Sequence, residues 1–123
     1  MVKQASFPVE IVPCSTVRNP GGLAMSSRNM RLTTLQKVAA ERIYQRLSSL
    51  SEMKKYKSIA VLKTWMHSVF LDDEDLVLEY FEISDPVSLQ ATKEWSDCDT
   101  HIACIAVFVG EVRLIDNILL KIN

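Results

Sequence analysis

Apolar side chains recur at three- and four-residue spacing after Thr33, a pattern typical of an amphipathic helix. The apolar positions are Leu35, Ala39, Ile43, Leu47 and Leu50. Thr33 and Gln36 have the spacing of a capping box, which predicts where this helix begins. We expect about four turns. The positions expected to face water are Lys37, Glu41, Arg42 and Arg46.

A second helical pattern starts near Ser58 and has a wider apolar stripe. Its members are Ile59, Leu62, Trp65, Met66, Val69 and Phe70. Because the stripe is wide and includes a tryptophan, we expect this helix to contribute heavily to the core. His67 stands beside the stripe and is expected at the surface or at an interface rather than as a catalytic base.

Three shorter apolar runs, at residues 76–83, 102–109 and 112–122, indicate strands. The run 102–109 is apolar without interruption, as in a strand in the middle of a sheet. Gly110-Glu111 is a candidate two-residue hairpin turn, with glycine supplying the positive φ. Two helices against a small antiparallel three-stranded sheet predict an α+β domain.

The connecting segments are less regular. Residues 7–12 would form a short strand or an extended linker before Pro13, and Pro20-Gly21-Gly22 predicts a turn. Asp85-Pro86 is expected to start a short helix that ends at Leu89. Residues 90–100 are polar apart from one tryptophan and are expected to form a loop.

The composition narrows the function classes. The chain has 123 residues, enough for one domain with a modest core. Its net charge of −1 gives no general attraction to nucleic acid or to an anionic membrane, so we expect neither as a partner. The longest apolar run is far too short to cross a bilayer, and the cytoplasm is the expected compartment.

Two clusters invite a metal-site interpretation that we do not adopt. Cys98, His101 and Cys104 are spaced like metal ligands, but positions three apart on a strand point to opposite faces. The acidic run Asp72–Asp75 lacks the alternating oxygens and central glycine of a calcium loop, so a solvated turn is expected. The three cysteines are expected to be free thiols, and no metal site is predicted.

Phosphate chemistry is suggested by the segment 21–29, Gly-Gly-Leu-Ala-Met-Ser-Ser-Arg-Asn. Glycine allows close backbone approach, and the serine hydroxyls can donate hydrogen bonds to phosphate oxygens. Arg28 carries a permanent charge on a planar fork that matches phosphate geometry. The spacing alone is a weak signal and favours a capped surface turn over a phosphate site.

Two longer motifs resemble a known family. The run 9–18, Val-Glu-Ile-Val-Pro-Cys-Ser-Thr-Val-Arg, continues into Gly22–Asn29, and together they resemble the segment that joins the two domains of pantothenate synthetases (pantoate–β-alanine ligases). The run 110–117, Gly-Glu-Val-Arg-Leu-Ile-Asp-Asn, resembles the closing signature of that family. The resemblance covers nearly the whole chain. It implies that Met-Ser-Ser-Arg corresponds to the KMSKS loop of class I aminoacyl-tRNA synthetases.

The resemblance implies an ATP-dependent ligase. Pantoate and ATP, with Mg²⁺, would form pantoyl adenylate and pyrophosphate, and β-alanine would then release AMP and pantothenate. The residues implied in ATP binding are Val17, Met25, Ser26, Ser27 and Arg28. Arg113, Asp116 and Asn117 are interpreted as a structural polar cluster rather than as catalytic groups. The resemblance also implies a homodimer for the full-length enzyme.

The family places a Rossmann-like domain with a His-x-Gly-His motif before this segment, and neither histidine of this chain stands in such a motif. We therefore expect residues 1–30 to be the linker with the ATP loop, including the last strand of that domain, and residues 31–123 to be the C-terminal α+β lid. The fragment alone is expected to be inactive, and its first 30 or so residues loosely anchored or paired with another copy. The alternative is a small non-enzymatic interaction module.

Overall fold

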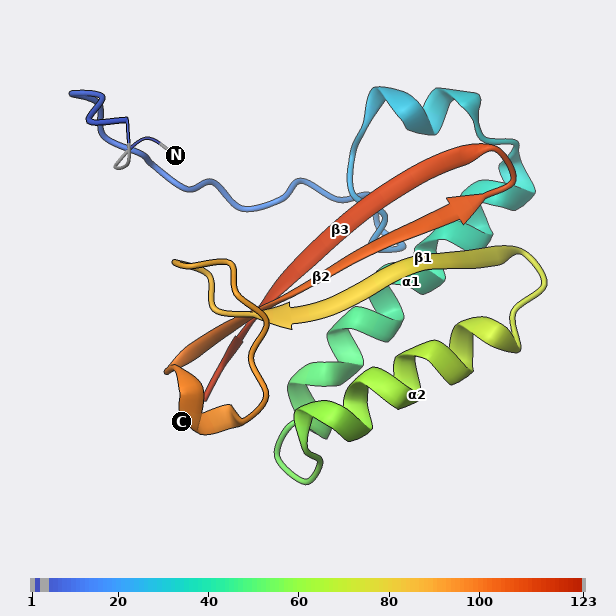
Figure 1. Ribbon diagram of the computed structural model, residues 1–123. Coiled ribbons are helices and arrows are strands. Elements are labelled where there is room, and N and C mark those ends of the chain that lie inside the picture. Colours follow the sequence, from blue (N-terminus) through green and yellow to red (C-terminus); the bar gives the residue numbers. More distant parts are fainter. Residues whose placement is uncertain (1, 3–4, 123) are drawn as a thin grey trace.

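The computed structural model describes residue 2 and residues 5–122, with two helices against one face of a three-stranded sheet (Figure 1). The sheet is antiparallel, in the order β1-β2-β3. The predicted α+β class is confirmed. The elements are η1 (Ser27–Arg31), α1 (Thr34–Met53), α2 (Ile59–Leu71), β1 (Leu76–Ser84), η2 (Trp95–Asp97), β2 (Thr100–Val109) and β3 (Val112–Lys121).

Strands β2 and β3 form a continuous hairpin closed at Gly110-Glu111, as predicted. Their pairing runs without a shift from Val109 opposite Val112 to Thr100 opposite Lys121. Gly110 has φ 58°, a left-handed conformation that glycine adopts without a Cβ clash. Because side chains alternate, one set of positions on both strands is buried beneath the helices.

Strand β1 pairs with the other side of β2 and contains a bulge. Leu78 lies opposite Val107, but Tyr80 lies opposite Ala106, so Glu79 is an extra residue between them. The extra residue shifts the alternation by one position. As a result both Leu76 before the bulge and Ile83 after it are buried.

Helix α1 begins where the sequence predicts and continues further, over 20 residues. The Thr33 hydroxyl accepts from the Gln36 amide at 3.2 Å, and the Gln36 side chain accepts from the Thr33 amide at 2.9 Å. Ala39 is the first residue of its apolar stripe to be buried. The expectation that Leu35 joins the core is wrong, because this first-turn side chain is 83% exposed.

Helix α2 matches its sequence pattern closely. The Ser58 hydroxyl caps its start by accepting from the Val61 amide. Leu62 and Met66 are fully buried, and Trp65 packs against the edge of the core. His67 is exposed, as expected. The helix lies mainly against β1, while α1 crosses β2 and β3 (Figure 1).

The acidic segment after α2 is not simply a solvated turn, and that expectation is wrong for Asp73. Its carboxylate accepts from Arg42 at 2.8 and 3.0 Å and from Arg46 at 2.5 Å, and it is only 6% exposed. Arg42 also pairs with Asp75 at 2.7 Å. The two arginines expected to face water therefore tie α1 to the end of α2.

Burial of the Asp73 carboxyl by itself would raise its pKa. Hydrogen bonds from Arg42 and Arg46 outweigh that effect and hold the pKa below its usual value of 3.8. The carboxylate is thus stabilised in its charged form by the fold.

The segment after β1 also differs from expectation. Asp85 accepts from the Val87 amide and the Ser88 hydroxyl, and the Leu89 amide bonds to the Asp85 carbonyl at 2.8 Å. Leu89 has φ 59°, a left-handed conformation that does not continue a helix. The expected short helix is therefore a single turn.

Of the three candidate metal ligands, His101 lies in the core, and Cys98 and Cys104 are partly buried. His101 is fully buried, with Nδ1 2.9 Å from the Thr92 hydroxyl and Nε2 3.2 Å from the Trp95 carbonyl. Cys98 lies beside the ring, and burial raises the pKa of the Cys104 thiol. The sequence did not predict that His101 ties the loop after β1 to the sheet.

Residues 5–17 extend away from the domain and are exposed (Figure 1). The loose anchoring expected for these residues stays a prediction. It fails from Arg18 onward, where side chains contact the domain. Among the described residues, no helix combines the length and the apolar character needed to cross a bilayer.

Replacing the helix cap should lower stability without changing the fold. Thr33→Ala removes the hydroxyl acceptor of the capping box and should cost about 1 kcal/mol of unfolding free energy. Urea unfolding measures this cost. Thr34→Ala is the matched control because Thr34 lies one position inside the helix. Equal costs for the two variants would contradict the role of the cap.

Acidification should remove the contribution of the Asp73 carboxylate to the free energy of unfolding. Because its folded-state pKa is lowered, the stabilisation is complete above about pH 4 and is lost as the pH falls through the folded-state value. Urea unfolding from about pH 6 to about pH 2 should therefore show a steeper loss for wild type than for Asp73→Asn. Asp72→Asn, at the exposed neighbouring position, should follow the wild-type slope. Identical slopes for all three proteins would contradict the assignment.

Candidate functional site

A short hairpin before η1 forms one wall of the site. Arg18 and Ala24 form an antiparallel bridge, and the Met25 amide donates to the Val17 carbonyl at 2.9 Å. The predicted turn lies at Pro20-Gly21 and is followed by Gly22, whose φ is 96°. The hairpin reverses the chain and delivers it to Ser26.

Arg18 attaches this hairpin to the far end of the chain. Its guanidinium donates to both carboxylate oxygens of Asp116, at 2.6 and 2.8 Å, and to the Gly22 carbonyl at 3.0 Å. It also stacks 3.8 Å from the centre of the Tyr44 ring on α1. The hydrogen bond with Asp116 raises the pKa of Arg18, against the opposing effect of burial.

A second polar side chain, next to Arg18 on the same strand, also holds the hairpin. The Asn19 amide group donates to Glu41 on α1 at 2.9 Å, and its oxygen accepts from the Leu23 amide at 2.9 Å. Leu23 itself is buried in the core. The hairpin is thus fixed to α1 and β3 by polar and apolar contacts together.

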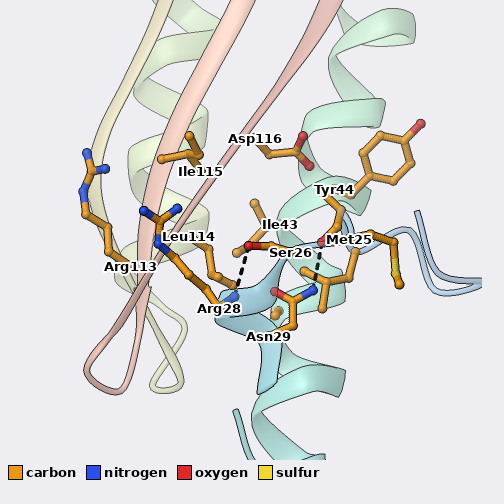
Figure 2. Close-up of a pocket in the computed structure, with 13 residues that line it drawn as sticks. Met25, Ser26, Arg28, Asn29, Ile43, Tyr44, Arg113, Leu114, Ile115 and Asp116 are labelled. Atoms are coloured by element: carbon orange, nitrogen blue, oxygen red, sulfur yellow. Dashed lines mark hydrogen bonds between the residues drawn. The ribbon is translucent and has the colours of Figure 1, made fainter. Parts of the chain in front are cut away.

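The turn that follows carries the serine–arginine motif. The Ser26 hydroxyl accepts from the Arg28 amide at 3.2 Å, and the Asn29 side chain donates to the Ala24 carbonyl at 2.9 Å (Figure 2). Asn29 therefore links the turn to the hairpin. Its side-chain oxygen is buried and has no hydrogen-bond partner among the described residues.

A cavity of about 230 Å³ lies between this turn, α1 and β3. In Figure 2 the guanidinium of Arg28 points toward the strand that carries Arg113. The lining residues are Leu23, Ala24, Met25, Ser26, Arg28, Asn29, Ala40, Ile43, Tyr44, Arg113, Leu114, Ile115 and Asp116.

The cavity brings together part of the predicted ATP site. Met25, Ser26 and Arg28 line it, whereas Val17 and Ser27 lie outside its lining. Val17 is joined to Met25 through the hairpin backbone, and Ser27 is exposed next to Ser26. The sequence did not predict that Tyr44 contributes, because nothing local to α1 marks its contact with the hairpin.

Charged side chains give the cavity a cationic character. Its charged lining residues, among those that the structure describes, are two arginines, Arg28 and Arg113, and one residue with a carboxylate, Asp116. Arg18 neutralises this carboxylate, and Arg113 pairs with the bulge residue Glu79 at 2.6 Å. Arg28 is exposed, so its charge can meet an anion.

Asp116 makes a structural contact with Arg18. This agrees with the interpretation of the polar residues in the motif 110–117 as a structural cluster. On β3 Asp116 points toward the helices, while Arg113 and Asn117 are exposed on the opposite face. The sequence did not show that Arg18 is the partner of Asp116, because the two residues are 98 positions apart.

Comparison with known proteins identifies close relatives. The pantoate-beta-alanine ligase family matches residues 1–119. The chain is 43% identical over 122 residues to a pantothenate synthetase of Phocaeicola vulgatus, and 42% identical over 118 residues to one of Azobacteroides pseudotrichonymphae. These matches cover 98% and 96% of this chain, respectively. The chain spans 43% and 42% of the lengths of these two relatives.

Solved structures give the same result. Pantothenate synthetase from Thermus thermophilus superposes with a TM-score of 0.84 at 30% identity, over 95% of this chain and 42% of its own. The ligase from Francisella tularensis, solved in complex with beta-gamma ATP and beta-alanine, matches with a TM-score of 0.55 at 27% identity. That match covers 96% of this chain and 36% of the Francisella chain.

The hairpin should depend on glycine at position 22. A Cβ there would lie 2.5 Å from the Tyr44 ring, on a backbone with φ 96°. Gly22→Ala should therefore cost about 1–3 kcal/mol of unfolding free energy, measured by urea unfolding. Gly21→Ala is the comparison and should cost less, because its Cβ would displace the flexible carboxylate end of Glu41, with its one hydrogen bond to Asn19, rather than an aromatic ring. A smaller cost at position 22 than at position 21 would contradict this account of the turn.

Proposed function

The chain belongs to the pantoate-beta-alanine ligase family, and we propose that it supplies the phosphate-binding loop of an ATP-dependent ligase that joins pantoate to β-alanine. In this reaction ATP and pantoate form pantoyl adenylate and pyrophosphate, and β-alanine then displaces AMP to give pantothenate. The cavity that brings Ser26 and Arg28 together is the observation that carries the proposal.

The size of the cavity favours part of a nucleotide over a whole one. At about 230 Å³ it is smaller than the roughly 300–1,000 Å³ of ordinary ligand pockets. A polyphosphate tail is compact and anionic, and it suits a small cavity that Arg28 lines. We therefore assign the cavity to the β- and γ-phosphates of ATP.

The adenylation step moves negative charge onto the departing pyrophosphate. Donors placed around that charge lower the barrier when they bind it more strongly in the transition state than in the substrate. The Ser26 oxygen accepts from the Arg28 amide and keeps its own O–H to donate. The Arg28 guanidinium supplies the positive charge. In this proposal Val17, Met25 and Ser27 complete the site by contacting the nucleotide from the hairpin and the turn.

Magnesium does not fit the residues of this cavity. Among the described residues, the only carboxylate in its lining is that of Asp116, and both of its oxygens accept from Arg18. We propose that Mg²⁺ arrives with the phosphates of ATP as part of the substrate. The protein's task here is then to bind the phosphates and to neutralise their charge.

Family membership supports the remaining parts of the proposal. The substrates would be ATP, pantoate and β-alanine, in line with the beta-gamma ATP and beta-alanine of the Francisella complex. We propose a cytoplasmic homodimer for the whole enzyme, with residues 1–30 linking a nucleotide-binding domain to the α+β lid formed by residues 31–123.

Removing the Arg28 guanidinium should slow adenylation more than it lowers stability. A charge-assisted hydrogen bond contributes about 1.5–3 kcal/mol, or roughly 10- to 150-fold in rate if it acts in the transition state. The test uses a chimera in which this chain replaces the matching region of the Phocaeicola vulgatus enzyme. Pyrophosphate release by Arg28→Ala should fall by that factor, while its unfolding midpoint stays near that of the parent chimera.

Arg31→Ala is the matched control, because Arg31 is exposed in the same turn but does not line the cavity. It should keep pyrophosphate release within about threefold, as expected for a charge that makes no direct hydrogen bond to the phosphates. Equal rates for Arg28→Ala and the parent chimera would remove Arg28 from the mechanism. That result would favour the alternative, a small interaction module.

A further inference from the structure

Arg18 marks the point at which the chain becomes attached to the domain. Every residue from 5 to 17 is exposed, and the Val17 side chain is 72% exposed. The Arg18 side chain, by contrast, is 15% exposed, and that of its partner Asp116 is 8% exposed. The change from exposed to largely buried side chains therefore occurs at Arg18, one residue after the Val17 carbonyl accepts from the Met25 amide.

The Arg18 side chain is held from three different parts of the fold. Asp116 is on β3, the Tyr44 ring is on α1, and the Gly22 carbonyl is at the turn of the hairpin. A bidentate arginine–carboxylate pair restrains direction as well as distance. The contacts therefore restrain the orientation of the hairpin as well as its position.

From the hairpin a short chain of contacts reaches the proposed phosphate loop. The hairpin strand ends at Ala24, whose carbonyl accepts from the Asn29 side chain inside the turn. Met25 is tied to the other strand through Val17, and Ser26 follows directly. A hairpin that moves would therefore carry Ser26 and the turn with it.

Arg18 also has an electrostatic effect on the cavity. Asp116 lines the cavity, and without a partner its carboxylate would repel a phosphate there. Both of its oxygens are occupied by Arg18, so the cavity retains the positive character given by Arg28.

We propose that Arg18 is a positioning residue that fixes the hairpin, and through it Ser26 and Arg28, while it neutralises Asp116. Arg18 acts through these groups and does not itself contact the substrate. What the loop binds rests on the proposed function. The positioning is a property of this chain alone and can be measured without any ligand.

Amide hydrogen exchange on the whole chain, followed by NMR, tests the positioning. Arg18→Gln should speed exchange of the hairpin amides of Asn19 and Met25 by at least about tenfold, because their protection requires a closed hairpin. Amides in the β2–β3 ladder, such as that of Leu114, should stay within about threefold of wild type.

Lys63→Gln is the control, since Lys63 forms a comparable ion pair with Glu82 at 2.7 and 3.0 Å far from the cavity lining. It should leave the hairpin amides unchanged. Unchanged hairpin exchange in Arg18→Gln would overturn the proposal. An equal rise throughout the domain would overturn it as well, because that result indicates general destabilisation.

A pyrophosphate titration on the same samples separates this inference from the proposed function. Arg18→Gln should weaken inorganic pyrophosphate binding at least about tenfold, and Arg18→Gln/Asp116→Asn should recover part of the loss because no unpaired carboxylate remains. Equal affinity of wild type and Arg18→Gln would overturn the link from the hairpin to the loop. If wild type itself binds no pyrophosphate, the proposed function fails, while the exchange result still decides the positioning.

Discussion

The alternation of side chains along β3 is the constraint on which the rest of the structure depends. It places Leu114, Asp116 and Ile118 on the same face of the sheet, beneath α1. A carboxylate in that row must be paired, because burying it alone would cost far more than burying an apolar group. Arg18 provides the partner, and the position of the whole hairpin follows from it. The hairpin that forms one wall of the cavity is thus held in place by Asp116, the one acidic residue in an otherwise apolar row of β3.

Local patterns in the sequence predicted most of the fold because they act over a few residues. The capping box at Thr33, the stripe of α2 and the hairpin turn at Gly110 are each decided within about one helical turn or one hairpin. The errors concern pairing over longer distances. Asp73 belongs to an ion-pair cluster with α1, and Leu35 has the right periodicity but lies before the buried part of its helix.

The candidate site was only partly predictable for the same reason. The resemblance identified Met25, Ser26 and Arg28, and the fold gathers all three around one cavity. The contributions of Tyr44 and Asp116 come from α1 and β3, which meet the loop only after the sheet and the helices have packed. Sequence spacing carries no information on such contacts. The motif therefore located the loop, while the surroundings that hold it required the structure.

The bulge at Glu79 places a restriction on the evolution of β1. The single extra residue reverses the inward and outward positions between Leu78 and Phe81, so both halves of the strand keep their apolar side chains under the helices. Deleting it would turn Phe81 and Ile83 toward the opposite face, and a second insertion elsewhere would do the same. This strand can exchange residue types far more readily than it can change its length.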